Sequence, residues 1–194
     1  MVDVVLTCYE KKHYNLKINS NSTNIGKNQI NIDSNLIVKE FKITGEVEVK
    51  GNISIEKANI IGLLDVRGEC NTENFNMKGT LKISGLLNAG NIDIETHSKC
   101  HVKEIGGEKI RIKRGTDTII KKAIKSLGVP KDFYLGQLIT DSIEGDEIYL
   151  EYVKAKVVRG DNIEIGPGCE IDLIEYKHIL KQHKTSSVGN KRKI

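Results

Sequence analysis

The sequence has few of the residues that usually build a compact core. Among 194 residues there is no tryptophan, only three phenylalanines and two prolines occur, and hydrophobic residues make up 38% of the chain. A core must therefore come from Ile, Leu and Val placed at regular positions. Glycine is plentiful at 18 residues, which is enough to mark many turns.

Long apolar runs are missing as well. The opening MVDVVLTCYE is too short for the apolar part of a signal peptide, and no later run approaches the roughly 18 apolar residues that a membrane span needs. The four cysteines, Cys8, Cys70, Cys100 and Cys169, show no CxxC spacing, which suits a reducing compartment better than a disulfide framework. We therefore expect a cytoplasmic protein whose contact with a membrane is at most peripheral.

The motifs of common enzyme and cofactor sites are also missing. No GxxxxGK[ST] phosphate loop, GxSxG nucleophile elbow or GxGxxG dinucleotide motif occurs. His97, Cys100 and His101 lie close in sequence, but on a strand or corner their side chains diverge, so we favour a core position for Cys100 over a metal site. The acids of 141–147 lack the spacing of a calcium loop. The sequence predicts no enzyme, no cofactor and no metal.

What the sequence does contain is a short phrase that repeats at a fixed period. GEVEVKG at 45–51 returns as GLLDVRG at 62–68 and as GTLKISG at 79–85. Alternate residues of a strand face the same side, so Val47 and Val49 face inward while Glu48 faces outward. Extended over 30–94, with further pairs six and eleven positions after each, this frame defines 24 inward positions, of which 23 are apolar and Thr72 is the exception.

This repeat predicts an all-β fold, a parallel β-helix with three sides. Three strands and three turns fill each coil of about 17 residues, and coils stacked about 4.8 Å apart place like residues above one another around one apolar column. Beyond Ile94 the column continues with looser register. Its anchors there are Ile105 and Ile110, Ile143 and Ile148, and Val158 and Ile163. We expect the core at 30–176 after a polar segment at 1–29, in which an irregular first coil is an open alternative.

One segment breaks the repeat. Between Arg114 and Leu138, apolar residues fall at helical spacing, and Gly128 with Pro130 is typical of a helix end. We expect one amphipathic helix inserted at about 115–138 and packed on a face of the β-helix. A helix that binds a partner is the alternative.

Charge is unevenly placed along the chain. Residues 177–194 hold six Lys and Arg and no acid, whereas the rest carries 24 Lys and Arg against 26 acids. We expect 177–194 to be a disordered basic tail. Lys191, Arg192 and Lys193 are candidates for contact with a membrane or an acidic partner, and no specific nucleic acid is expected.

Short strands of the form G-x-[apolar]-x-[apolar]-x-G in a three-sided coil, between a polar segment and a basic tail, resemble the bactofilins, polymer-forming bacterial cytoskeletal proteins. The phrases IEGDEIYLE and VVRGDNIEIGPGCEIDLIEY are similar to the Firmicutes branch of that family. The resemblance covers about 30–176. The inserted helix and the lack of an N-terminal membrane-targeting peptide depart from it.

The resemblance implies a right-handed β-helix that assembles end to end into filaments without nucleotide. It further implies a cytoplasmic scaffold near the membrane, acting in morphogenesis, cell-wall or motility processes. The implied partners are the protein itself, a second bactofilin, and cell-wall enzymes or a membrane-associated complex.

Polymerisation also has a physical basis. Each end of a β-helix exposes unpaired backbone groups and an uncovered slice of core, and such edges invite further strands. We expect no cap unless the flanking segments supply one, and we expect the terminal coils to carry the contacts. The residues concerned are Ile30, Ile32, Leu36, Val38 and Phe41 at one end, and Ile163, Ile165, Cys169, Ile171 and Leu173 at the other.

Two other functions stay open. A non-polymerising dimerisation and binding module, like the C-terminal domain of the division inhibitor MinC, shares the short three-sided coil. An acyltransferase of the hexapeptide type fits less well, because its strict six-residue period places one aliphatic residue inward on each face, whereas this repeat places two.

Overall fold

The chain winds into one parallel β-solenoid. The computed structural model describes residues 5–7, 17–18, 29–115 and 136–194, and these form a single sheet of 11 strands with no helix among them. The strands are β1 (Val5–Thr7), β2 (Lys17–Ile18), β3 (Gln29–Ile32), β4 (Leu36–Val49), β5 (Ile53–Val66), β6 (Cys70–Thr96), β7 (Lys99–Arg114), β8 (Gln137–Leu150), β9 (Val153–Ile165), β10 (Glu170–Gln182) and β11 (Ser187–Lys193).

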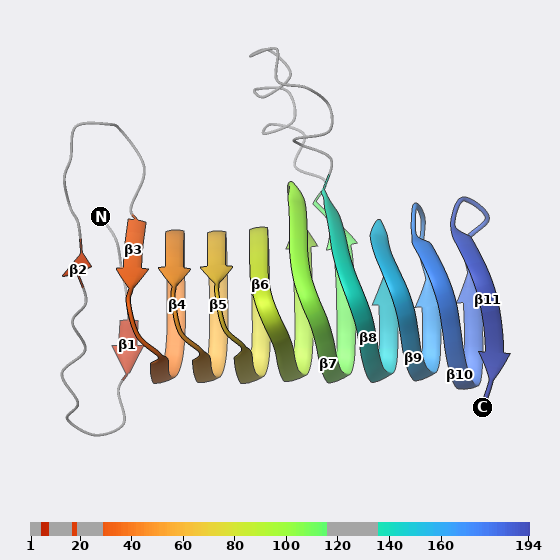
Figure 1. The fold of residues 1–194 in the computed structure, drawn as a ribbon, viewed down its shortest axis with the longest axis horizontal. Helices are drawn as coiled ribbons and strands as arrows, with labels where there is room; N and C mark the ends of the chain where they lie inside the picture. The colour runs from red at the N-terminus through yellow and green to blue at the C-terminus, as the bar shows by residue number, and fades with distance from the viewer. Residues whose placement is uncertain (1–4, 8–16, 19–28, 116–135) are drawn as a thin grey trace, which may run out of the picture.

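From β3 to β11 every strand pairs in parallel with the next one along the chain. The coils therefore stand side by side along a rod, with β3 and β11 at opposite ends (Figure 1). β1 and β2 are antiparallel to β4 and β3. The all-β parallel β-helix that the repeat predicts is confirmed.

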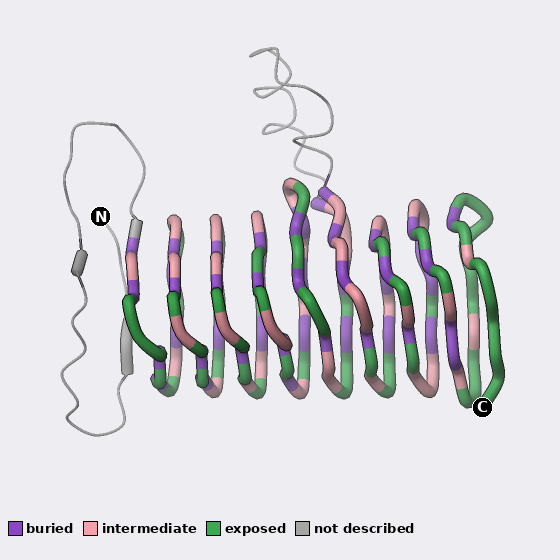
Figure 2. The backbone as a smooth tube through the Cα atoms, viewed as in Figure 1, coloured by how far each residue is buried: buried purple, intermediate pink, exposed green. Residues whose placement is uncertain are grey.

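The first coils keep the register of the repeat without a break. Leu36 pairs with Ile53 and Ile53 with Cys70, and the same spacing joins Gly45 to Gly62 and Gly62 to Gly79. All 23 apolar positions of the predicted frame are buried, and buried segments recur at matching places in successive coils (Figure 2).

Thr72 is the half-buried exception within this frame. Its hydroxyl lies 3.1 Å from the backbone oxygen of Glu56 and 3.1 Å from that of Asn74. The hydroxyl donates a hydrogen bond that these two oxygens share. A polar residue is tolerated in the apolar column here because its hydrogen-bonding capacity is satisfied locally.

The second half keeps the columns but changes the length of the coil. Ile105 lies in register with Ile143, although 116–135 stands between them in the sequence. The coils that follow are shorter than those of the first half, since Ile143, Val158 and Ile174 are successive members of one column. The predicted anchors of this half are confirmed as members of continuous columns.

A column of glycines marks one corner of the first coils. Gly45, Gly62 and Gly79 have φ values of 145°, 133° and 138°, which L side chains rarely adopt. A Cβ atom on Gly62 would lie 1.9 Å from the backbone oxygen of Gly45 in the coil before it. The corner therefore requires glycine both for its backbone angles and for the close stacking of coils.

The predicted inserted helix lies almost wholly at 116–135, outside the described residues. At its flanks, the backbone N–H of Gly115 donates to the Thr96 oxygen (2.8 Å), and Nε of Arg114 donates to the Gly136 oxygen (2.7 Å). The two flanks of 116–135 therefore lie close together, and β7 pairs directly with β8. Leu138, assigned to the end of the helix, is instead a buried residue of β8.

The prediction of a disordered tail at 177–194 is wrong. β10 continues to Gln182, and β11 then forms a further stretch of coil that pairs in parallel with Glu170–Tyr176. Backbone pairing with β10 holds this segment in the sheet, although its polar composition gives no sign of a strand. The β-solenoid therefore extends past 176, nearly to the last residue.

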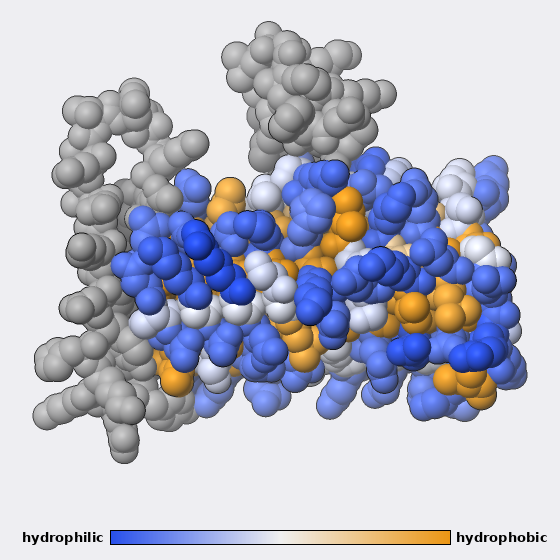
Figure 3. Space-filling view, viewed as in Figure 1, coloured by the Kyte–Doolittle hydropathy of each residue, from blue (hydrophilic) through white to orange (hydrophobic). Residues whose placement is uncertain are grey.

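The outside of the rod is polar and largely self-neutralised. Side chains of opposite charge in successive coils lie close together, as in Lys50–Asp33 (2.8 Å) and Lys156–Asp141 (2.8 Å). Hydrophilic residues accordingly cover most of the visible side, with small hydrophobic patches between them (Figure 3). Exposed pairs of this kind contribute little to stability, so the continuous apolar column contributes more.

Candidate functional site: the ends of the solenoid

The N-terminal end carries two short antiparallel strands. β2 pairs with β3, placing Ile18 opposite Ile30, and β1 pairs with β4, placing Leu6 opposite Phe41. Two sides of the first coil therefore have a neighbouring strand. The predicted contact residues of this end, Ile30, Ile32, Leu36, Val38 and Phe41, are all buried within the chain.

The predicted contact residues at the C-terminal end are also interior. Ile163, Ile165, Cys169 and Ile171 are buried, and Leu173 is half-buried. β11 lies beyond them, because it pairs with the outer edge of β10. The prediction from the sequence ended the β-helix core at 176 and so placed this end of the rod about one strand too early.

The core that remains partly uncovered at this end consists of other residues. Tyr176, Leu180 and Val188 are half-buried and pack against the buried column. Leu180 belongs to 179–182 of β10, which pairs with β9 on one side and has no strand on its other side in the described chain. Sequence reasoning missed Leu180 and Val188 because both were assigned to the disordered tail.

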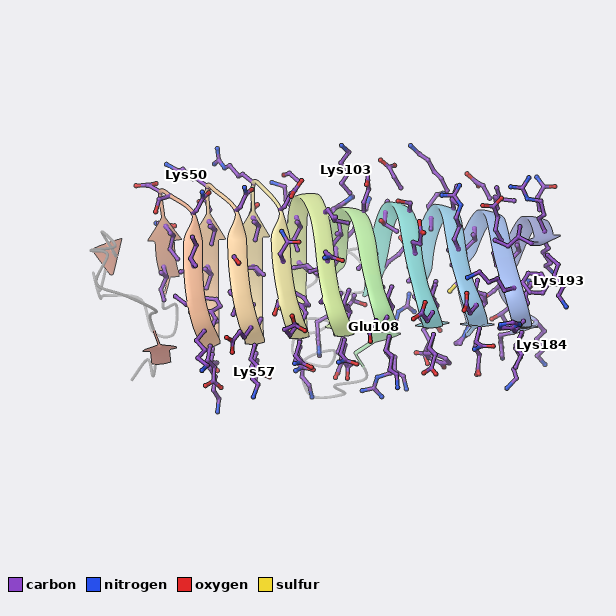
Figure 4. The ribbon with its side chains drawn as sticks, turned by 90° about the horizontal axis from the view of Figure 1, so that it is seen from below. Lys50, Lys57, Lys103, Glu108, Lys184 and Lys193 are labelled. Carbon is purple, nitrogen blue, oxygen red and sulfur yellow. The ribbon has the colours of Figure 1, made fainter. Side chains whose placement is uncertain are left out.

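Basic side chains crowd the same end. Arg192 forms an ion pair with Glu175, which also pairs with Arg159 of β9. Lys184, Lys191 and Lys193 are exposed, and none lies within ion-pair distance of an acid in the described chain. Figure 4 shows Lys184 and Lys193 at the end of the rod, far from Lys50 and Lys57. The end is therefore both apolar and positively charged.

The residues of the HSKCH phrase do not form a binding cluster. Cys100 is buried, and its sulfur accepts a hydrogen bond from the Leu81 backbone N–H at 3.3 Å, so its predicted core position is confirmed. His97 lies 3.2 Å from Glu95, whereas His101 is exposed on the outer side of β7. In the described ranges no three His, Cys, Asp or Glu side chains are grouped so that they could hold a metal ion.

Burial also makes the thiols poor nucleophiles. It raises the pKa of Cys70 to about 12 and that of Cys100 to about 11. The pKa of Cys169 is raised for the same reason. Because the thiolate is the reactive form, these three side chains act as small core residues.

A shallow groove of about 550 Å³ runs along one side of the rod. Its charged residues pair with one another, as in Lys109–Glu147 and Lys181–Glu164, both at 3.8 Å. The Tyr149 hydroxyl, which also lines it, donates to Glu151, and this hydrogen bond raises the pKa of Tyr149 to about 12. The groove thus presents neutralised charges and a tyrosine that stays protonated near neutral pH.

The fold places this chain in the class of parallel β-solenoids. None of the described segments is a helix with the length and apolar character needed to cross a bilayer. No protein-family model matches the sequence, and no solved structure matches it.

Two relatives come from Bacillus subtilis strain 168. The chain is 39% identical over 99 residues to the uncharacterised protein YhbF, a match that covers 51% of this chain and 37% of YhbF. It is 40% identical over 57 residues to the uncharacterised protein YhbE, covering 29% of this chain and 24% of YhbE. The chain therefore matches well under half the length of either relative.

Proposed function

We propose that this chain is a structural scaffold of the bactofilin type, which stacks end to end into filaments without nucleotide. The observation that carries the proposal is the end of the solenoid itself, where Leu180 and Val188 leave the apolar column half-covered beside an open strand edge. A second copy would cover these residues and continue the column. The scaffold would work in the cytoplasm and position partners there.

The contact needed for such a filament is between unlike surfaces. One end of the rod carries β1 and β2 in antiparallel pairing, and the other ends on β11 and the last part of β10. A contact between unlike surfaces that does not close into a ring produces an open chain of subunits. Its partners, whether a second bactofilin, cell-wall enzymes or a membrane-associated complex, follow from the resemblance alone.

A non-polymerising binding module is the second candidate, and two observations favour it. Antiparallel strands lie against two sides of the first coil, and lysines occupy the last strand. Short added strands and edge lysines are both means by which natural sheets prevent edge-to-edge association. Such a module would exist as one small species at every concentration.

A pair of leucine variants separates the two candidates. Leu180 and Leu63 are both half-buried, but Leu180 lies at the C-terminal end and Leu63 on the side of the rod in β5. We expect Leu180→Arg to abolish filaments and Leu63→Arg to leave them, as measured by sedimentation velocity after circular dichroism has confirmed the fold. Equal assembly by both variants would mean that the contact between subunits lies elsewhere. If the wild-type protein never assembles, the binding module is the candidate that remains.

Residues of the buried column are unsuitable for this test. Phe41 and Ile171 are 1% and 3% exposed, so an arginine at either position would disturb folding before assembly.

A further inference from the structure

We propose that the outer edge of β11 binds an extended acidic segment of another protein, which adds as a further parallel or antiparallel strand beside Lys191 and Lys193. The proposal rests on the open edge, on the placement of the lysines and on the lack of an acid within ion-pair distance of them among the described residues. It does not depend on filament formation.

The backbone of β11 is available for a further strand. Within the described chain β11 has one neighbour, β10, and forms the last strand of the sheet. The N–H of Ile194 donates to the Tyr176 oxygen of β10 at 2.9 Å. Backbone groups of a strand alternate between its two edges, so those of Lys193 and Lys191 point away from β10. A strand added at this edge would form hydrogen bonds with the backbone groups of the two lysines.

The lysines stand where earlier coils carry apolar residues or glycine. Lys191 is in register with Ile174 and Lys193 with Tyr176, and the coil before these holds Val158 and Gly160. A strand continuing the stack would therefore meet positive charge at two positions separated by one residue. Acidic residues with the same spacing match them in either strand direction.

The charges on β11 differ from those on the two strands before it, β9 and β10. Cations of neighbouring coils have acidic partners, as Lys177 has Asp161 (2.7 Å) and Lys154 has Glu170 (2.9 Å). Lys191 and Lys193 have none in the described chain, although Arg192 between them is held by Glu175. The edge is thus fixed in place by Arg192 while two lysines remain for an anionic partner. In strand addition, main-chain hydrogen bonds supply the affinity and contacts of alternate side chains supply the specificity.

The competing interpretation is that these lysines only prevent association. Lysines on an edge strand are a common protection against edge-to-edge pairing. That interpretation predicts no affinity for an acidic strand, and it predicts that removing the charge causes self-association.

The test uses the full chain at a concentration where sedimentation shows one small species, so that its outcome is independent of assembly. The probe is a short fluorescent peptide of alternating Glu and Val flanked by Thr, and binding is measured by fluorescence anisotropy. A second peptide has the same charge, with proline in place of each Val, and cannot pair as a strand. Vesicles of phosphatidylglycerol and phosphatidylcholine serve as an alternative anionic surface.

The protein variants are matched in charge. One carries Lys191→Glu and Lys193→Glu. The control carries Lys99→Glu and Lys103→Glu, two exposed lysines on the side of the rod in β7 that also have no acidic partner in the described chain. We expect the end variant to bind the Glu–Val peptide about tenfold more weakly or worse, and the control to bind it like wild type. The proline peptide should not bind.

Several results would overturn the proposal. These are no binding by the wild type, equal binding of the proline peptide, or equal loss in the control variant. Vesicle binding without peptide binding would assign the lysines to a lipid surface. If the end variant self-associates and the wild type binds no peptide, the role of Lys191 and Lys193 is only to prevent edge pairing.

Discussion

Glu175 and Arg192 are joined across the last two strands of the solenoid by an ion pair, and Arg159 contacts the other oxygen of the same carboxylate. The three residues are in register in β9, β10 and β11, and the Glu175 side chain is 4% exposed. A carboxylate this far from water is stabilised by its two guanidinium partners. The contact therefore holds the final strand against the rod.

Glu175→Ala should release β11. We expect a loss of about 1–3 kcal/mol in the free energy of unfolding, because charged hydrogen bonds to both arginines disappear. Hydrogen exchange should become fast at 187–193 while β9 stays protected. Glu170→Ala is the control, because both side chains of its pair with Lys154 are more than half exposed, so its loss should change stability little. Unchanged protection of 187–193 in Glu175→Ala would contradict this role.

Gly62→Ala should destabilise the fold strongly. Its φ of 133° and the approach of a new Cβ to 1.9 Å from the Gly45 oxygen require the backbone of two coils to shift. We expect a loss of at least ~1–3 kcal/mol in urea unfolding. Gly106→Ala is the comparison, because its nearest contact would be the Asn88 side chain at an ordinary 3.4 Å. Similar stability of the two variants would show that the glycine corner is not required.

The buried thiols should resist alkylation in the folded protein. In a Cys8→Ser background, we expect iodoacetamide to leave Cys70, Cys100 and Cys169 unmodified at about pH 8, because burial raises the pKa of each and shields the sulfur. Unfolding in urea should make all three react, as counted by mass spectrometry. Rapid labelling of Cys70 without urea would contradict its place in the core.

The same pKa shift predicts a dependence of stability on pH. Burial raises the pKa of Cys70 from 9.0 to about 12, so the folded state keeps its proton where the unfolded state has lost it. This contribution is fully present below pH 9.0 and declines as the pH rises toward about 12. Between these values the unfolding free energy of the wild type should fall more steeply with pH than that of Cys70→Ala. Parallel curves would contradict the shift.

The sequence was sufficient to predict the inward residues of the coils whose length does not vary. From Ile30 to Ile94 the spacing of the repeat is strict, so alternation alone identifies the inward residues. Where the length changes, single positions could not be assigned. The register between β6 and β7 shifts after Ile83, and the buried residues Val102 and Thr140 of the later coils were not predicted.

The last strand could not be predicted for a different physical reason. In 187–193 only Val188 is apolar, so no alternating pattern exists. Backbone pairing to β10 and the burial of Glu175 between two arginines hold this segment in place, and both are long-range effects. The basic residues were recognised from the sequence, but the end of the apolar column was placed about one strand too early, and Leu180 was missed.

Electron microscopy of the purified, nucleotide-free protein, combined with sedimentation velocity over a concentration series, tests the central claim most directly. The account predicts unbranched rods that form without ATP or GTP and lengthen with concentration, because the half-covered core at Leu180 and Val188 is completed by a second copy. One small species at every concentration would contradict end-to-end assembly and would identify the chain as a binding module.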